Sequence, residues 1–189
     1  PVDAPMQIDS SAMKAGALES LLRVPPSGQV LDRMVFLVAE LVKDDPASSC
    51  GLRKDMMGRN CEIEDYPNKV ISCATLLNLL NESMNQLDSQ GPVVRAGIPH
   101  NGRLVIVGDT HGQLADLFWM WFKHGIPDAK TVYVFNGDIC DRGGHAVEIW
   151  ILLLYAKRVF PNSVFINRGN HEDAYCNSNL GFHFELRKK

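Results

Sequence analysis

No part of this 189-residue sequence is apolar for long enough to cross a membrane. The longest apolar run, residues 149–156, has eight residues, whereas a spanning helix needs about 20. No segment has the basic, apolar and small-residue order of a signal peptide. We therefore expect a soluble protein of the cytoplasm or nucleus that has no membrane partner.

An excess of charge of one sign is also lacking. Nineteen Lys and Arg residues face 22 Asp and Glu residues, which gives a formal net charge of −3. This balance offers no electrostatic reason to expect a nucleic-acid partner. Apolar residues make up 46% and charged residues 22% of the chain, and this ordinary globular usage excludes a disordered or collagen-like protein.

Paired cysteine motifs are absent. The five cysteines are odd in number, and none forms a CxxC pair or a Cys/His pair with zinc-site spacing. This pattern favours free thiols in a reducing compartment. Cys140 falls within a charged motif described below, and we expect it to be buried in the packing.

The second half of the sequence alternates between β-rich runs and helical patterns. The predicted strands are 103–107, 131–135 and 163–167, and the predicted helices between them are 113–124 and 146–159. This alternation indicates an α/β fold with parallel strands joined by right-handed crossovers. The aromatic residues Trp119, Trp121 and Phe122 are expected to belong to the core.

The first half of the sequence shows helical patterns and a polar segment. Helical patterns are predicted at 11–23, 31–42 and 73–87, with a polar surface connection at 44–69. We therefore divide the chain into a helical N-terminal extension, residues 1–70, and the start of a second domain, residues 71–189. The last residues form a helical pattern with no stop signal, and the sequence begins without Met, so we expect a fragment.

Each β-rich run is followed by glycine and then by Asp or Asn. The residues are Asp109, Asp138 and Asn170, which are 29 and 32 residues apart. Because a βαβ unit takes about 30 residues, each step returns the chain to the same end of the sheet. Open α/β sheets bind ligands at this carboxyl end, so the three side chains are expected to converge there.

The side chains at this edge are typical of a metal site. Asp109 and His111 can bind one ion, Asp138 can bridge two, and Asn170 offers an amide oxygen. Such oxygen and imidazole ligands without a thiolate suit Mn, Fe or Zn. Two ions about 3.5–4 Å apart can polarise a phosphoryl oxygen and activate a shared water.

Three neighbouring residues complete the pattern. His171 is placed to protonate a leaving oxygen, and Asp141 is a candidate for orienting it. Arg142 offers a planar guanidinium that matches two phosphate oxygens. The set therefore indicates metal-dependent hydrolysis of a phosphate ester.

The motifs that carry these residues are GDTHG at 108–112, GDICDRG at 137–143 and GNHE at 169–172. They resemble the signature motifs of the metal-dependent serine/threonine phosphoprotein phosphatases, within the calcineurin-like metallophosphoesterases. The resemblance extends over residues 71–184 and is strongest to the branch that holds phosphatase 5 and the EF-hand phosphatases. It implies part of the calcineurin-like fold, namely the βαβαβ core of a β-sandwich flanked by helices, with a helical N-terminal region.

The resemblance also implies a role for each matching position. Asp109 and His111 bind the first of two divalent ions (Mn, or Fe and Zn), Asp138 bridges both ions, and Asn170 binds the second. His171 is the general acid and pairs with Asp141, while Arg142 and Asn170 hold the substrate phosphate. A hydroxide that bridges the two metals attacks a phosphoserine or phosphothreonine of a protein substrate in one step. Arg168 and Glu172 are interpreted as local salt-bridge scaffolding. Regulatory domains or subunits are possible partners.

The sequence departs from the family pattern after His171. The family adds two further histidine ligands and a second arginine from a later region, and nothing here matches them. We therefore expect the N-terminal part of a catalytic domain that is inactive or nearly so by itself. Two alternatives remain: a phosphodiesterase or dinucleotide polyphosphate hydrolase with the same core, and an inactive truncated interaction module.

Overall fold

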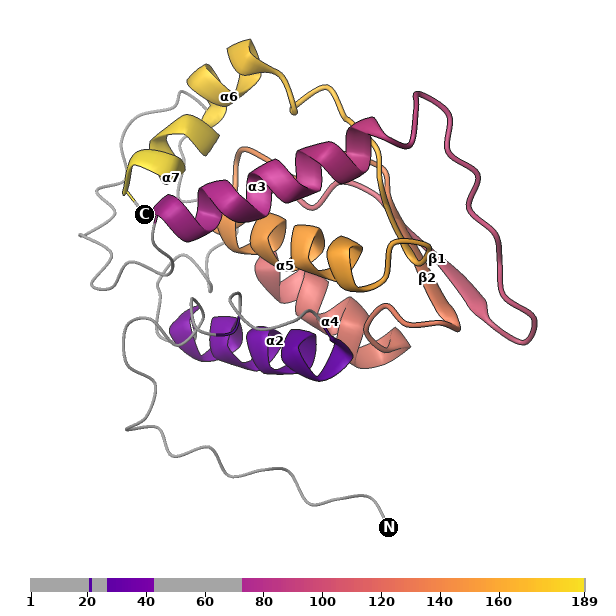
Figure 1. Cartoon of the computed structure of the whole chain (residues 1–189). Coiled ribbons are helices and arrows are strands. Elements are labelled where there is room, and N and C mark those ends of the chain that lie inside the picture. The colour runs from indigo at the N-terminus through magenta and orange to yellow at the C-terminus, as the bar shows by residue number, and fades with distance from the viewer. Residues whose placement is uncertain (1–20, 22–26, 43–72, 189) are drawn as a thin grey trace.

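The computed structural model describes residues 21, 27–42 and 73–188. The elements of this part of the chain follow in order (Figure 1): α2 (Gly28–Val42), α3 (Cys73–Asp88), β1 (Arg103–Val107), α4 (Leu114–His124), β2 (Thr131–Phe135), α5 (Ala146–Val159), β3 (Val164–Ile166), α6 (Ala174–Leu180) and α7 (Phe182–Lys188).

A three-stranded parallel sheet forms the centre of the predicted α/β unit. The strand order is β1-β2-β3, with Val107 paired with Phe135 and Phe135 paired with Ile166. Helices α4 and α5 connect the strands, so all three strands end at the same edge. The predicted α/β fold with parallel strands is confirmed. The described residues contain this one sheet, and a second sheet of a sandwich is not among them.

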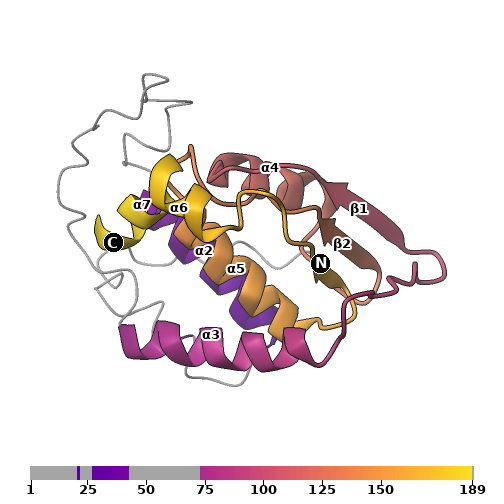
Figure 2. The same cartoon turned by 90° about the horizontal axis from the view of Figure 1, so that it is seen from above.

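Helix α5 is the centre of the packing. It contacts α2, α3, α4, α7 and β3, and the helices gather on one side of the sheet in both views (Figures 1 and 2). In α2, Leu31, Met34 and Val38 are fully buried in the same hydrophobic cluster as α5. The predicted boundary at residue 70 stays a prediction, but α2 shares a core with the elements that follow it.

The predicted helices and strands of the described part agree with the structure to within about three residues at their ends. The short helix α6 was not expected. The predicted connection 44–69 lies outside the described residues, as does all of the predicted helix 11–23 except Leu21. One prediction about the core is wrong in part: Trp121 is buried, but Trp119 is 57% and Phe122 is 92% exposed.

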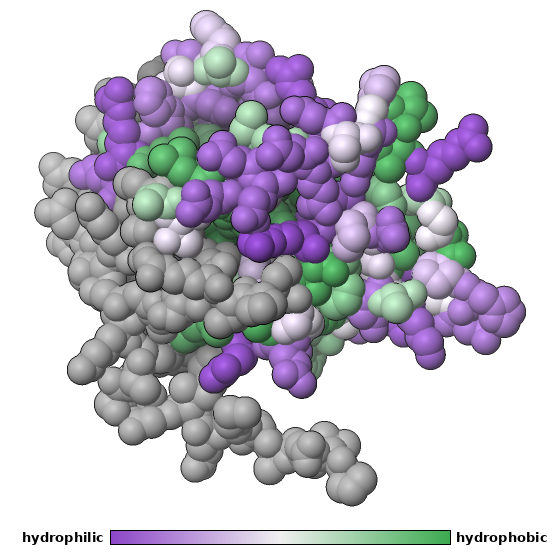
Figure 3. All heavy atoms as spheres, in the orientation of Figure 1, coloured by the Kyte–Doolittle hydropathy of each residue, from purple (hydrophilic) through white to green (hydrophobic). Residues whose placement is uncertain are grey.

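Apolar side chains also reach the surface elsewhere in the described part (Figure 3). Ile106 on the edge strand β1 is 71% exposed, and Val93 before this strand is 81% exposed. A sheet of three strands leaves its edge strands without a further strand as neighbour, and β1 is one of them. No helix among the described residues is both long enough and apolar enough to span a membrane.

Candidate metal and phosphate site

Asp138 joins the three motif loops at the carboxyl edge of the sheet. Its carbonyl oxygen accepts hydrogen bonds from the backbone N–H groups of Thr110 (3.1 Å) and His111 (3.0 Å) in the first loop. Its carboxylate Oδ1 accepts a hydrogen bond from the backbone N–H of His171 in the third loop, at 2.8 Å. The loops thus meet at one point, as the spacing of the motifs predicts.

His111 is oriented as a metal ligand would be. Its Nδ1 lies 2.8 Å from the carbonyl oxygen of Cys140, and because a carbonyl only accepts, Nδ1 must donate. The lone pair of the neutral ring is then on Nε2, which lies 3.7 Å from Asp109 Oδ2. Holding one ring nitrogen by a backbone carbonyl so that the other can bind a metal is a common arrangement in metalloproteins.

Ligand atoms of His111, Asp138 and His171 all lie within 4.8 Å of one another. This group overlaps the predicted ligand set but differs from it, because His171 was expected to act as an acid. The side chain of Asp109 is 62% exposed and approaches His111. Asn170 is exposed in the loop directly before His171. The metal-binding roles of Asp109 and Asn170 stay predictions.

Asp141, His171 and Arg142 form a line of contacts beside this group. Asp141 Oδ2 lies 3.0 Å from His171 Nδ1, and both side chains are buried. Arg142 Nη2 lies 3.3 Å from His171 Nε2. Because a guanidinium only donates, Nε2 accepts in this arrangement, and Nδ1 donates its proton to Asp141. The contact between His171 and Asp141 is present as expected, while the general-acid role stays a prediction.

The site backbone adopts conformations that side chains disfavour. His111 (φ 41°), Asp138 (51°), Asp141 (67°) and Arg142 (66°) all have positive φ, and in the described part Asn101 is the one further non-glycine residue that does. Such conformations persist where the surrounding structure holds them, and they cluster at functional sites. All four residues were singled out from the sequence.

Glycine is required where the second and third loops touch. Gly137 has φ 90°, and a Cβ added to it would overlap the backbone of Gly169. A Cβ on Gly169 would overlap the backbone nitrogen and the carboxylate of Asp138. These two glycines therefore allow the loops to approach closely enough for Asp138 to contact both neighbours.

Glu172 has a role that the sequence analysis missed. Its carboxylate accepts four backbone hydrogen bonds, from Asp138 (2.7 Å), Ile139 (2.8 Å), Cys140 (3.1 Å) and Gly169 (2.9 Å). Burial raises the pKa of this carboxyl, but the four N–H donors outweigh burial and hold the pKa below its ordinary value. Glu172 ties the second loop to the third through backbone amides. The predicted salt bridge is present for Arg168, whose Nη2 lies 3.4 Å from Asp173 Oδ2. Glu172 instead binds backbone amides.

Cys140 is buried, as expected. The indole Nε1 of Trp150 donates to its sulfur at 3.1 Å, and burial raises the pKa of the thiol to about 12. The side chain is therefore a protonated thiol near neutral pH, and thiolate coordination of a metal is unfavourable here.

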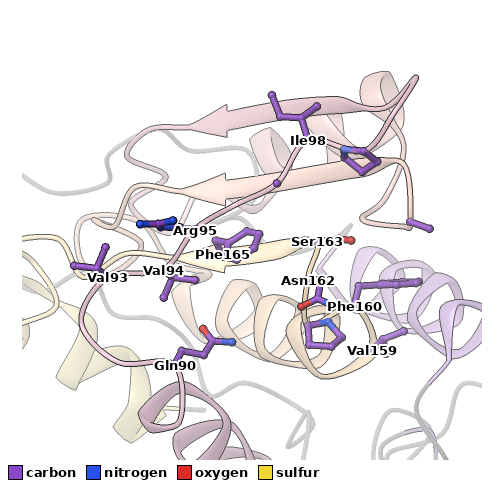
Figure 4. Close-up of a pocket in the computed structure, with 14 residues that line it drawn as sticks. Gln90, Val93, Val94, Arg95, Ile98, Val159, Phe160, Asn162, Ser163 and Phe165 are labelled. Carbon is purple, nitrogen blue, oxygen red and sulfur yellow. The ribbon is translucent and has the colours of Figure 1, made fainter.

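A separate cleft of about 820 Å³ lies on the described surface (Figure 4). It is lined by the segment before β1, including Arg95, and by Phe160 and Ser163 in the connection between α5 and β3. Figure 4 shows that Ser163 lies at the amino end of the strands and Arg95 toward their carboxyl end, so the cleft runs along β3. None of the predicted site residues lines the cleft.

Comparisons with known proteins relate the chain to one family of phosphatases. Residues 102–189 match the family model described as calcineurin-like phosphoesterase. The chain is 41% identical over 116 residues to serine/threonine-protein phosphatase rdgC of Drosophila melanogaster, covering 61% of this chain and 17% of that protein. It is 36% identical over 136 residues to serine/threonine-protein phosphatase T of Schizosaccharomyces pombe, covering 72% of this chain and 28% of that protein.

A solved structure with a related fold is a protein serine/threonine phosphatase from Saccharomyces cerevisiae with similarity to human phosphatase PP5. The TM-score is 0.60 at 30% identity, and the match covers 63% of this chain and 38% of the other. Residues 102–189 therefore belong to the calcineurin-like phosphoesterase family, and the homologues of the chain are serine/threonine phosphatases that include EF-hand phosphatases. The chain spans about one sixth of the length of the first curated relatives it matches.

Proposed function

We propose that this chain carries the metal-binding and phosphate-holding part of a protein serine/threonine phosphatase that acts on phosphoserine and phosphothreonine in proteins. The observation that carries the proposal is the meeting of three motif loops at Asp138, which places carboxylate, imidazole and guanidinium groups around one point. The kinship with serine/threonine phosphatases supports the same substrate class.

The side chains present fit divalent ions. His111 directs its free ring nitrogen toward Asp109, and Asp138 lies within the same group of ligand atoms. Carboxylate and imidazole ligands with no thiolate suit Mn, or Fe and Zn. Asp109, His111 and Asp138 would hold one ion, and Asp138 and Asn170 would contribute to the second. Such ions, when bound, would supply Lewis-acid polarisation of a phosphoryl oxygen and an activated water.

The remaining residues would bind and orient the substrate and move a proton. The guanidinium of Arg142 would hold two phosphate oxygens of the substrate, and Asn170 would donate an amide hydrogen bond to the phosphate. Substrate binding would draw Arg142 away from His171 Nε2, which could then carry a proton. Asp141, bonded to Nδ1, would stabilise the resulting imidazolium until Nε2 transfers its proton to the leaving serine or threonine oxygen.

A metal titration tests the site in this chain directly. Calorimetric titration with Mn²⁺ should show binding to the 189-residue chain, and thermal unfolding should shift upward as Mn²⁺ is added. Asp138→Asn should weaken binding at least tenfold, because the bridging carboxylate is lost. Asp116→Asn, the same substitution on the exposed face of α4, is the matched control and should bind Mn²⁺ like the unaltered chain. Equal binding by both variants, or an unfolding temperature that does not respond to Mn²⁺, would refute the metal site and favour the interaction-module alternative.

An activity assay tests the substrate class. The 189-residue chain is expected to be nearly inactive, so the longest protein product of the same gene is assayed beside it with Mn²⁺. The substrates are a phosphoseryl peptide, bis-phenyl phosphate and diadenosine tetraphosphate. Preferential hydrolysis of the peptide supports the proposal, whereas preference for either of the other two substrates supports the phosphodiesterase or dinucleotide polyphosphate hydrolase alternative. A cytoplasmic or nuclear location stays a prediction.

A further inference from the structure

Helices α6 and α7 are fastened to the turn that carries Asp141 and Arg142. The backbone N–H of Arg142 donates to the carbonyl oxygen of Leu180 (3.3 Å), and the N–H of Phe182 donates to Asp141 Oδ1 (2.9 Å). Asn177 on α6 adds a side-chain hydrogen bond of 2.7 Å to the carbonyl oxygen of His171. The α6–α7 segment thus contacts both motif loops that carry the predicted proton-transfer pair.

A further attachment of α7 uses a buried carboxyl group. Glu185 on α7 is 3% exposed, and its carboxylate accepts hydrogen bonds from the backbone N–H groups of Ala146 (3.2 Å) and Val147 (2.9 Å). These are the first two residues of α5, whose N-cap residue, His145, makes no side-chain cap hydrogen bond. His145 itself is buried, at 2% exposure. A carboxylate from 39 residues further along the chain therefore takes over the capping of α5.

The position of α5 matters because the Asp141–Arg142 turn leads directly into it. Asp141 and Arg142 are consecutive residues with φ near 67°, a left-handed conformation that persists only where neighbouring groups hold it. The turn is held on one side by the bonds to Leu180 and Phe182. On the other side it is held by the start of α5, which Glu185 fixes to the same helix α7.

We propose that Glu185 is a positioning residue: by binding the amino end of α5 it keeps the Asp141–Arg142 turn in its left-handed conformation and presents the Arg142 guanidinium to the substrate phosphate. The inference rests on the proposed function in one respect, the assignment of Arg142 to the phosphate. The structural half of the inference can be tested without any activity.

Backbone amide exchange followed by NMR tests the structural half. In Glu185→Gln an NH2 group replaces one of the two acceptor oxygens, and this group cannot accept a hydrogen bond. The Asp141–Arg142 turn should therefore open more often. The informative amides are those of Arg142 and Gly143, which do not bond to Glu185 themselves. We expect their exchange to accelerate at least tenfold relative to the amides of β2. His183→Gln, the same new residue at an exposed position of α7, is the matched control and should leave the exchange within threefold. Equal acceleration in the turn and in β2 would show a merely structural role and would overturn the proposal.

Phosphate binding tests whether Glu185 acts through Arg142. The probe is inorganic phosphate, titrated into the Mn²⁺-loaded chain, with Glu185→Gln and Arg142→Ala made singly and together. We expect Glu185→Gln to weaken binding about tenfold in the original background and less than twofold in the Arg142→Ala background. Weakening by the same factor in both backgrounds would overturn the proposal. If the original chain binds no phosphate, the proposed function fails, and the amide exchange alone decides the positioning role. If Glu185→Gln does not fold, Glu185→Asp, which keeps the charge on a shorter side chain, replaces it.

Discussion

Lys157 on α5 offers a quantitative test of the packing. Its side chain is fully buried, its ammonium donates to the carbonyl oxygen of Pro161 at 2.7 Å, and the nitrogen lies 4.9 Å from the centroid of the Phe165 ring. Burial lowers the pKa of this lysine from its ordinary value of 10.5 to about 8. Since one pKa unit is about 1.36 kcal/mol, keeping the charge buried costs about 3 kcal/mol at pH 7.

Lys157→Met removes the charge while keeping a long unbranched side chain, so it should raise the free energy of unfolding by about 2–3 kcal/mol at pH 7. Between pH 8 and 10.5 the unfolded chain holds the lysine proton and the folded chain does not. The unaltered protein therefore gains stability from Lys157 as the pH rises through this window. The difference between variant and unaltered protein should fall toward zero by pH 10.5.

The assay is urea unfolding followed by tryptophan fluorescence, repeated from pH 7 to 10.5. The quantity to compare is the difference between the two proteins, because Cys140, with its pKa raised to about 12, lowers the stability of both as the pH rises above its ordinary thiol value. Lys123→Met on exposed α4, where the ammonium lies 4.4 Å from the Trp119 ring, is the control and should change stability by less than about 1 kcal/mol. A difference for Lys157→Met that stays constant with pH would refute the reasoning.

Three further predictions concern the site. Glu172→Gln should lose two charge-assisted backbone hydrogen bonds, which lowers the free energy of unfolding in urea by about 2–4 kcal/mol. The control Glu82→Gln breaks the surface ion pair with Arg158 (2.7 Å) and should lower this free energy by less than about 1 kcal/mol. A loss of equal size in both variants would contradict the role of Glu172. Iodoacetamide followed by mass spectrometry should modify the half-buried Cys176 before Cys140, and the reverse order would show that the Cys140 thiol is accessible. Gly169→Ala should lower the unfolding temperature and abolish its response to Mn²⁺, because the added methyl group overlaps Asp138; a retained response would show that the loops can separate without loss of the site.

The regular elements around the site follow from patterns that the sequence displays. Apolar periodicity predicts α5 with the bounds that the structure has, and the Gly-Asp and Gly-Asn steps predict where the loops meet. Apolar periodicity does not predict helix α6, because its seven residues include two Asn and one Ser, which have low helix propensity. Its start depends on Asp173, which accepts a hydrogen bond from the Tyr175 N–H, and such a cap is hard to distinguish from an ordinary turn.

The errors in the sequence analysis have physical reasons. The aromatic run of α4 continues all round the helix, so it cannot be buried on every side; Leu117 and Trp121 face the core, while Trp119 and Phe122 face away from it. Glu172 accepts hydrogen bonds from backbone amides, and the pattern of side chains in a sequence does not predict such partners. The pairing of Glu185 with α5 depends on how α7 packs, and the spacing of residues along the chain does not reveal it.

The bonds that converge on Asp138 have a consequence for how the protein matures. Its partners in the first and third loops lie about 30 residues away in each direction, so the ligand geometry cannot exist until both crossovers have closed. Under the proposed function, a half-folded or newly emerging chain would therefore have little affinity for the metal ions. Metal binding would then report that both crossovers have formed, and a metal-responsive signal could be used to follow that folding step.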